Sequence, residues 1–432
     1  MKRHSISKVR TAYGISEYRL GNGLRVLYKK AAAAPVAAVC VTFHVGSRNE
    51  APGHTGSTHI LEHLLFKDSK KFNAKNGNAI TDYLEWFGSY VNATTWLDRT
   101  NYFELVPRER IREALELEAD RMRGSLFSEA DLASEMTVVR NEYERGRNNP
   151  FELLDEAMMA EAFTTHPYRI PTIGTKEDIE GSTAQKLREF YDTFYWPNNA
   201  TLSIIGDVSW REAEKYILKY FGPIPPSPHP IPKMEAIEPA QTARRAVSLE
   251  EPLGISIASL MYKVPEATHK DFAPLVVASM ILGGGFSSRL QRALVDTGKA
   301  AEVSVAMPPL NDPGVLSVVA HLANGVPHAS ALAAMRTELK RLSGKAPAAQ
   351  ELRRAKDRII STAAFQKDGV LREARALSEA IAAGDWTLDY RLEKEVGRVS
   401  AKDVMRVAKK YFVPAGETSG VLLDASFSPE TA

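Results

Sequence analysis

The sequence is poor in cysteine, in net charge and in long apolar runs. Its 432 residues contain a single cysteine, Cys40, which excludes both an internal disulfide framework and a cluster of cysteine metal ligands. Lys and Arg number 55 against 53 Asp and Glu, a formal charge of +2. A balance so close to neutral predicts neither nucleic acid nor a membrane surface as a partner.

Membrane and export signals are also missing. No stretch approaches the roughly 20 uninterrupted apolar residues of a membrane span. The basic segment 1–14 lacks the apolar core of a secretory signal. We therefore expect a cytoplasmic protein, or a periplasmic one if a leader has been removed.

Motifs of two other enzyme classes are absent. There is no G-x-S-x-G, and Cys40 lies in the apolar run VAAVCVTF, which favours a buried strand cysteine over a nucleophile. The glycine run ILGGGFSSRL at 281–290 is not followed by G-K-[ST], so we interpret it as a tight turn into a helix.

The length of the chain and one proline-rich segment predict two domains. Residues 222–240 contain seven prolines and should form an extended connector. We expect an N-terminal domain over 1–221, a linker over 222–246 and a C-terminal domain over 247–432. In each half two strand-like segments precede a helical one, which indicates a duplicated α+β unit.

One apolar stretch contains three residues that do not suit a buried helix face. Residues 57–66 read STHILEHLLF, with His59, Glu62 and His63 among leucine and isoleucine. Residues four apart share a helix face, so the two imidazoles can point at one spot, with Glu62 at its edge. This H-x-x-E-H order reverses the H-E-x-x-H of zinc proteases. A zinc site is favoured over two core histidines, because unpaired polar groups on such a face would be costly.

A catalytic zinc site needs a third protein ligand and one position for water. The best candidate segment is 131–147, where Glu135 and Glu142 lie seven residues apart and so share a helix face. Glu144 should point away from Glu142. From spacing alone, a solvated acidic helix face is an equal alternative.

Three other histidines compete for the role of third ligand. His54 lies only five residues before His59, too close for good geometry, while His44 falls in a strand-like segment and His166 precedes a proline. We interpret each of the three as structural.

The order of these motifs resembles one family. The chain is similar to the inverzincin peptidases of the pitrilysin type (M16), and within them to the short subunits of mitochondrial processing peptidase and of bacterial M16B peptidases. The resemblance covers nearly the whole chain and is carried by LGNGLRVLYKK, VGSRNE, GSTHILEHLLFK, VNATTWLDRTNYFE, ASEMTVVRNEYERGR, HPYRIPTIGT, FYWPNNATLSIIGDV and LGGGFSSRLQRAL. It implies two homologous α+β domains, each a mainly antiparallel sheet with helices packed on it, that together form half of a clamshell.

The resemblance also implies a zinc endopeptidase and a role for each site residue. His59, His63 and Glu142 would bind Zn²⁺, and Glu62 would be the catalytic base that activates the zinc-bound water. Glu135 matches a supporting carboxylate near the site. The implied substrates are peptides or small unfolded proteins, cleaved inside an enclosed chamber.

Two further features of the resemblance concern the substrate. Asn92 and Ala93 match the edge strand that holds the substrate backbone, as an extended peptide can add to an open sheet edge. Many relatives carry an Arg and a Tyr after the second-half glycine turn that help bind substrate. Here Val295 and Glu302 stand about where that pair would be, and Arg292 is three residues early.

The missing pair and the half-clamshell length predict a dimer. We expect a heterodimer in which a related subunit supplies the Arg and Tyr, with a second copy of this chain as the alternative partner. Two other functions stay open: a non-catalytic scaffold like the core proteins of respiratory complexes, and a dedicated maturation protease for one precursor peptide. The complete metal motif disfavours the scaffold.

Overall fold

The computed structural model describes residues 5–425, which form two compact units. Unit 1 contains the chain up to Tyr143 together with residues 170–235 and 366–387, and unit 2 contains residues 144–169, 236–365 and those from Leu388 on. Each unit therefore takes residues from both sides of the proline-rich segment. Between α8, which ends at Tyr220, and β8, which begins at Arg245, there is no helix or strand, as the prolines predict. The domain bounds 1–221 and 247–432 stay a proposal.

Unit 1 is built on a sheet of seven strands in the order β1-β2-β3-β7-β4-β6-β5. Only β3 and β7 pair in parallel, and the other neighbours are antiparallel. The central strand β4 has the run VAAVCVTF, which is buried on both faces because helices cover both sides of the sheet. The strands are β1 (Ile6–Ala12), β2 (Ile15–Leu20), β3 (Arg25–Lys30), β4 (Val36–Phe43), β5 (Tyr90–Thr95), β6 (Thr100–Pro107) and β7 (Ala200–Gly206).

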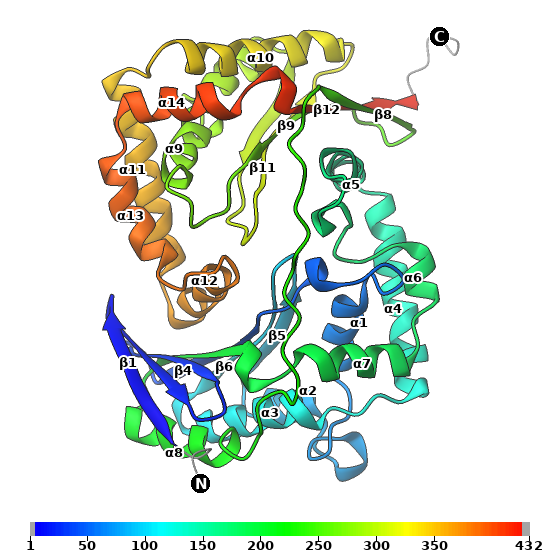
Figure 1. The fold of residues 1–432 in the computed structure, drawn as a ribbon, viewed down its shortest axis with the longest axis vertical. Helices are drawn as coiled ribbons and strands as arrows, with labels where there is room; N and C mark the ends of the chain where they lie inside the picture. Colours follow the sequence, from blue (N-terminus) through cyan, green and yellow to red (C-terminus); the bar gives the residue numbers. More distant parts are fainter. Residues whose placement is uncertain (1–4, 426–432) are drawn as a thin grey trace. The chain divides into compact units, whose positions relative to one another are not determined.

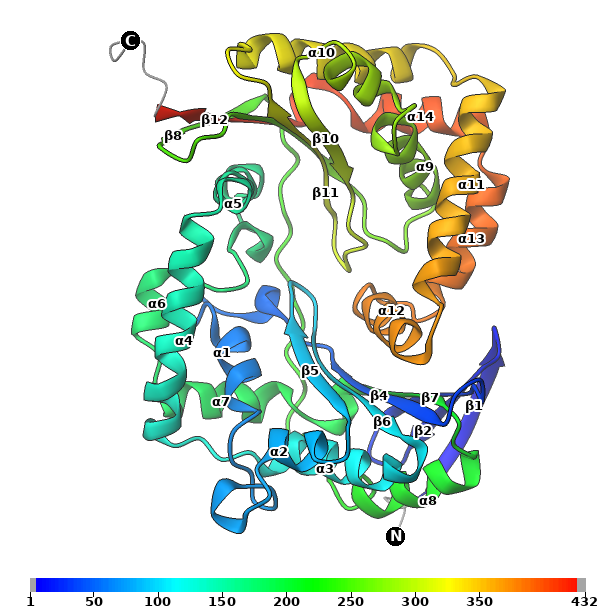
Figure 2. The same cartoon turned by 180° about the vertical axis from the view of Figure 1, so that it is seen from behind.

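The helices of unit 1 lie on the two faces and at one end of this sheet. In Figures 1 and 2, α3 and α8 lie on one face and α12 on the other. The helices are α1 (Ser57–Leu64), α2 (Ile80–Glu85), α3 (Ile111–Gly124), α4 (Glu129–Arg147, whose last residues belong to unit 2), α6 (Lys176–Glu180), α7 (Ala184–Phe194), α8 (Trp210–Tyr220) and α12 (Val370–Ala382).

Helix α12 comes from the far end of the chain, yet polar contacts fix it on the first sheet. The Ser378 hydroxyl is fully buried, accepts the Asn101 side-chain amide at 2.7 Å and pairs with the Thr42 hydroxyl at 2.9 Å. Lys29 and Glu373 pair at 2.7 Å at another point of the same face. Buried polar groups need such partners, so these contacts define where α12 sits on the sheet.

Unit 2 has a five-stranded sheet in the order β10-β11-β9-β12-β8, with β8 and β12 parallel and the rest antiparallel. Helices α9, α10 and α14 cover one face, and α5 packs on β8, β9 and β12 from the other (Figure 1). The strands are β8 (Arg245–Glu251), β9 (Ile257–Val264), β10 (Ala300–Ala306), β11 (Gly314–Leu322) and β12 (Glu417–Asp424). The helices are α5 (Pro150–Ala162), α9 (Phe272–Gly283), α10 (His328–Gly344), α11 (Ala349–Gln366), α13 (Leu388–Arg398) and α14 (Ala401–Tyr411).

An ion cluster joins α9 to α14 within unit 2. The buried Asp271 carboxylate, just before α9, pairs with Arg406 at 2.8 Å and Lys410 at 3.0 Å, and the Tyr411 hydroxyl donates to it at 2.8 Å. Burial alone would raise the pKa of Asp271, but these partners outweigh it and lower the pKa well below its usual range. The cluster is therefore a stabilising contact that needs the ionised carboxylate.

The structure confirms the predicted fold class, which is α+β with a sheet and packed helices in each unit. The glycine run after α9 is a turn that leads into a helical segment, as expected. Across residues 5–425, every helix is too short or too polar to cross a membrane.

Candidate metal centre

The candidate centre begins with the way α1 is fixed. Gly56 precedes the helix with a φ of 85°, and a Cβ there would lie 2.5 Å from the Ile173 carbonyl oxygen, so only glycine fits. The side chains of Ile60, Leu61 and Leu64 are fully buried in the core of unit 1. The apolar part of STHILEHLLF thus anchors the helix, and its polar residues are left on the other side.

Glu50 holds the N-terminus of α1. Its buried carboxylate accepts the backbone N–H of Gly56 at 2.7 Å and that of Thr58 at 2.6 Å, and it also accepts the Thr58 hydroxyl. Burial raises the pKa of Glu50 to about 8, and these donors offset part of the rise. Because the first N–H groups of a helix have no partner within it, Glu50 substitutes for a capping side chain.

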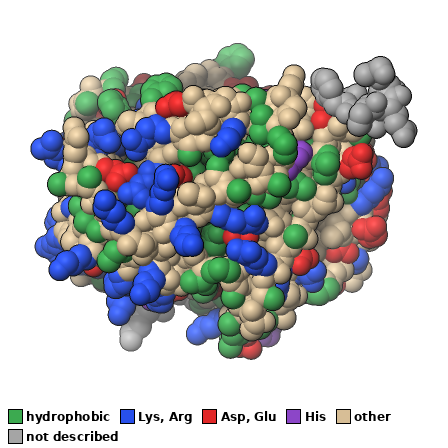
Figure 3. All heavy atoms as spheres, turned by 90° about the horizontal axis from the view of Figure 1, so that it is seen from above, with side chains coloured by type: hydrophobic (Ala, Val, Ile, Leu, Met, Phe, Trp, Pro, Cys, Tyr) green, Lys and Arg blue, Asp and Glu red, His purple; other side chains and the backbone are tan. Residues whose placement is uncertain are grey.

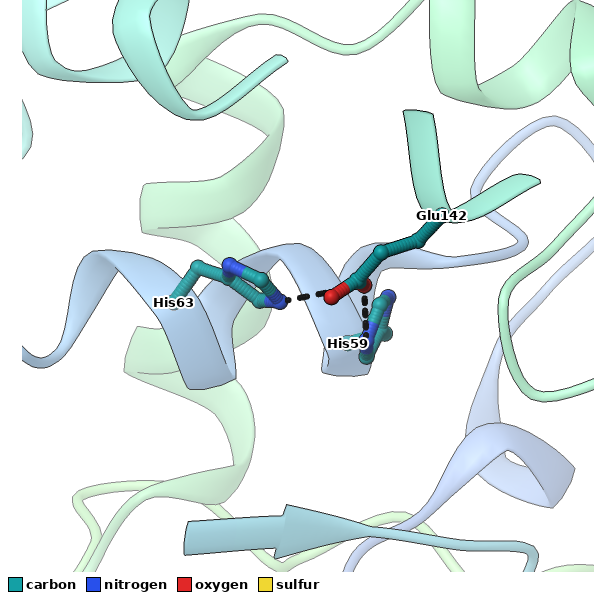
Figure 4. A group of neighbouring side chains, drawn as sticks. All are labelled: His59, His63 and Glu142. Atoms are coloured by element: carbon teal, nitrogen blue, oxygen red, sulfur yellow. Dashed lines mark ion pairs between the residues drawn. The ribbon is translucent and has the colours of Figure 1, made fainter. Parts of the chain in front are cut away.

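His59, His63 and Glu142 converge on one point (Figure 4). The two histidines come from α1 and the glutamate from α4, some eighty residues later. Oε2 of Glu142 lies 3.4 Å from Nε2 of His59 and 3.5 Å from Nε2 of His63. Among residues 5–425 this is the one group of at least three His, Cys, Asp or Glu side chains with metal-binding spacing.

These distances fit a tetrahedral ion better than hydrogen bonds. An N–H···O bond has a typical length of about 2.7–3.2 Å, shorter than either contact. A tetrahedral ion with bonds of about 2.1 Å separates its ligand atoms by about 3.4 Å. Two imidazole nitrogens and one carboxylate oxygen are also a donor set that zinc prefers. The residues present therefore fit a zinc ion with one position open.

The surroundings of both histidines suit a role as metal ligands. Burial lowers the pKa of His59 to about 4, so its imidazole is neutral at pH 7. Nδ1 of His63 lies 3.1 Å from Oε2 of Glu135, and because an ionised carboxylate only accepts, Nδ1 must carry the proton. Nε2 of His63 is then free to bind a metal.

Glu135 is itself held by Lys67, whose Nζ lies 2.6 Å from Oε1. Burial would raise the pKa of Glu135, but the bonds from Lys67 and His63 outweigh it and lower the pKa. The contact supports the expectation that Glu135 is a supporting carboxylate. Lys67 was not among the residues predicted from the sequence, since its place four residues after His63 carries no motif of its own.

Glu62 lies beside the convergent group, and its side chain lines one cavity together with His59, His63 and Glu142. This cavity has a volume of about 660 Å³ and is also lined by Asn92, Phe66 and Asp131. Burial raises the pKa of Glu62, and the Thr95 hydroxyl offsets part of the rise. A carboxyl group with a raised pKa is a stronger proton acceptor than an ordinary glutamate, which suits a catalytic base.

The strand that contains Asn92 and Ala93 lies at the edge of the seven-stranded sheet. Strand β5 pairs with β6 on one side, and no described strand pairs with its other side. Asn92 lines the cavity, while the Ala93 side chain is buried and its N–H bonds to the Asn92 side chain at 2.8 Å. The structure thus brings an open strand edge next to the candidate metal ligands.

The other candidate residues lie elsewhere. Nε2 of His44 is 2.9 Å from the Thr201 hydroxyl inside the sheet, and Nε2 of His166 is 3.2 Å from Asp312 in unit 2. Neither they nor His54 and Glu144 belong to the convergent group. Val295 and Glu302 are in unit 2, the latter with an exposed side chain on the edge strand β10.

The fold and this geometry together define a class of protein: two α+β units, of which the first presents two histidines and a glutamate arranged for a metal ion. Comparison with known families identifies the class. The model described as "Insulinase (Peptidase family M16)" matches residues 25–176, and the model "Peptidase M16 inactive domain" matches residues 182–359. The chain belongs to peptidase family M16.

Relatives and solved structures agree with this assignment. The zinc protease PqqE of Helicobacter pylori is 30% identical over 400 residues, which cover 88% of this chain and 86% of the relative. A probable mitochondrial-processing peptidase subunit beta of Arabidopsis thaliana is 26% identical over 265 residues, which cover 61% of this chain and 49% of the relative.

A crystal structure of a Helicobacter pylori protease superposes with a TM-score of 0.89 at 27% identity, covering 97% of this chain and 99% of the other. The first half of the periplasmic protease PqqL from Escherichia coli, at 17% identity, has a TM-score of 0.77 over 98% of this chain and 96% of its own. The latter similarity concerns the fold alone.

Proposed function

We propose that this chain is a zinc-dependent endopeptidase that hydrolyses peptides or small unfolded proteins. The observation that carries the proposal is the convergence of His59, His63 and Glu142, whose ligand atoms all lie within 4.8 Å of one another, with Glu62 beside them in one cavity. The names of several relatives, which are zinc proteases, support the same metal and reaction.

In this proposal each residue has one task. His59, His63 and Glu142 hold the ion, and Glu135 keeps His63 in the tautomer that offers Nε2. Zinc at such a site lowers the pKa of a water towards 7 and polarises a peptide carbonyl. Glu62 accepts the proton of the attacking water and then gives it to the leaving amine.

The open edge of β5 is the proposed place for the substrate backbone. A peptide added antiparallel or parallel to β5 gains main-chain hydrogen bonds whatever its side chains are. Asn92 lies on the cavity wall, so a strand bound here passes the metal-binding residues. This arrangement favours extended, unfolded substrates over folded ones.

We further propose that the active form is a dimer that encloses a chamber. The positions at which many relatives have the substrate-binding Arg and Tyr hold Val295 and Glu302 in this chain. A related subunit that carries the pair would complete the site, in preference to a second copy of this chain. The relative from Arabidopsis thaliana is named as a subunit, which agrees with a paired assembly.

The test is peptide cleavage by the purified chain with and without zinc. We expect a quenched fluorescent, unstructured peptide to be cleaved only when zinc is bound, and faster after co-expression with a related subunit that has the Arg and Tyr. His63→Ala should lose both zinc and cleavage, whereas His54→Ala, a matched control outside the donor group, should keep both. Cleavage by the metal-free chain at the same rate would overturn the proposal.

The same test separates the scaffold alternative. A scaffold subunit needs no metal, so it would show no cleavage either alone or with a partner while remaining folded. The complete donor set favours the peptidase. Without a metal ion, holding three polar side chains around one point would cost folding free energy and serve no function.

A further inference from the structure

Unit 2 contains a cavity that the peptidase proposal does not use. It has a volume of about 850 Å³ and lies between the helical segment after the glycine turn, the end of α10 and the start of α11. Five of its lining residues are basic, and we call it the basic cavity: Arg289, Arg292, Arg341, Lys345 and Arg354. The whole chain has a formal charge of only +2, so this is a local concentration of positive charge.

Acidic residues neutralise only part of this charge. Arg289, which is largely buried, forms two bonds of 2.8 and 2.9 Å with Glu351. Arg341 pairs with Glu338 at 2.6 Å. Within residues 5–425, no carboxylate lies within ion-pair distance of the three other basic side chains of the cavity. Five basic and two acidic side chains line the cavity, which leaves an excess of three positive charges, although Arg292 also acts on Glu351 and helps to lower the pKa of that carboxyl group.

Two helix ends meet at the cavity and contribute partial charges of opposite sign. Helix α11 begins at Ala349 beside the cavity, and its first turn lines the wall with Gln350 and Glu351. The N-terminus of an 18-residue helix carries a partial positive charge and free N–H groups. The end of α10 also lies there, with Arg341 in its last turn and Lys345 directly after it to balance the negative end of that helix.

The surface view agrees with this distribution. On the face seen in Figure 3, which looks onto α10 from above, Lys and Arg side chains gather on the left part and Asp and Glu mainly on the right.

We propose that the basic cavity binds a small anion with several closely spaced phosphate or carboxylate groups. Guanidinium groups bind such oxygens through two parallel N–H donors, and a net excess of three positive charges in the lining matches an anion of three or more charges. The volume lies in the usual range of small-molecule sites and exceeds what one phosphate needs. Arg289 and Glu351 form a fixed, partly buried floor, and the exposed side chains of Arg292, Lys345 and Arg354 close over the anion.

Calorimetric titration of the full-length protein with inorganic tripolyphosphate, and separately with citrate, tests this site. The site variant is Arg292→Glu with Arg354→Glu. The matched control is Lys340→Glu with Arg353→Glu, which changes the net charge by the same amount at exposed positions of α10 and α11 that do not line the cavity. All three proteins have the same candidate metal centre, so any heat from zinc chelation is common to them.

We expect one tripolyphosphate per chain, with an affinity at least about tenfold weaker in the site variant and within about threefold of wild type in the control. Tighter binding of tripolyphosphate than of citrate assigns the site to phosphates, and the reverse order assigns it to carboxylates. The proposal is overturned if neither anion binds at about 1 mM, or if both variants lose affinity equally, since that result would show a diffuse charge effect.

Discussion

Removal of the Glu135 carboxylate should weaken zinc binding without touching a ligand. The carboxylate uses Oε2 for His63 at 3.1 Å and Oε1 for Lys67 at 2.6 Å, and its side chain is 11% exposed. Glu135→Gln keeps one acceptor oxygen and replaces the other by an NH2 donor. The glutamine can therefore keep only one of the bonds to His63 and Lys67. At the other position its NH2 group would face an N–H donor.

The size of the effect follows from which bond is lost. The Lys67 side chain is 35% exposed and can turn to water, so the glutamine should keep His63 and give up Lys67. Glu135→Gln should then cost about tenfold in zinc affinity, or about 1.4 kcal/mol, at the low end of what supporting carboxylates contribute. Glu135→Ala loses both bonds and should cost about a hundredfold.

Competition with a chromophoric zinc chelator at pH 7 measures this difference. Glu129→Gln, an exposed glutamate at the start of the same helix, is the matched control and should leave the affinity unchanged. If Glu135→Ala binds zinc within about threefold of wild type, the contact between Glu135 and His63 does not orient the ligand, and the reasoning fails.

Three further predictions concern packing and are measured by urea denaturation. Glu50→Ala leaves the N–H groups at the start of α1 without an acceptor and should lower the free energy of unfolding by about 2–4 kcal/mol; a loss below about 0.5 kcal/mol would disprove its capping role. Ser378→Ala leaves two buried partners of α12 unpaired and should cost about 1–3 kcal/mol, whereas an unchanged stability would show that α12 does not depend on this contact. Asp271 has a folded pKa below its ordinary value of 3.8, so its stabilisation is present above that pH and is lost as the pH falls below it. Wild-type stability should thus fall more steeply between about pH 5 and 2 than that of Asp271→Asn, and parallel curves would refute the assignment.

The sequence allowed the core of the candidate site to be predicted because its signals are local. His59, Glu62 and His63 lie within five residues, and helical periodicity places them on one side of α1. Glu142 was one of two carboxylates predicted on a shared helix face. Their spacing alone did not distinguish a metal ligand from a solvent-exposed acidic residue. The structure brings its Oε2 to both imidazoles and places Glu135 behind His63.

Other contacts depend on parts of the chain that no local pattern connects. Glu50 reaches the start of α1 across a turn, and Lys67 acts through Glu135, which is 68 residues away in sequence. The packing of a helix from one half of the chain on the sheet of the other half also joins residues far apart in sequence. Amphipathic patterns show which face of α5 or α12 is buried, but not that each packs on a sheet built mainly from the other half.

We propose that Glu62 acts as the base at a zinc site formed by His59, His63 and Glu142, and this role can be tested by itself. Its most direct test compares wild type with Glu62→Gln in two measurements on the same samples: zinc content and hydrolysis of an unstructured peptide. We expect about one zinc per chain in both proteins and a loss of hydrolysis of at least about a hundredfold in the variant. Hydrolysis by Glu62→Gln at the wild-type rate, with zinc still bound, would contradict it.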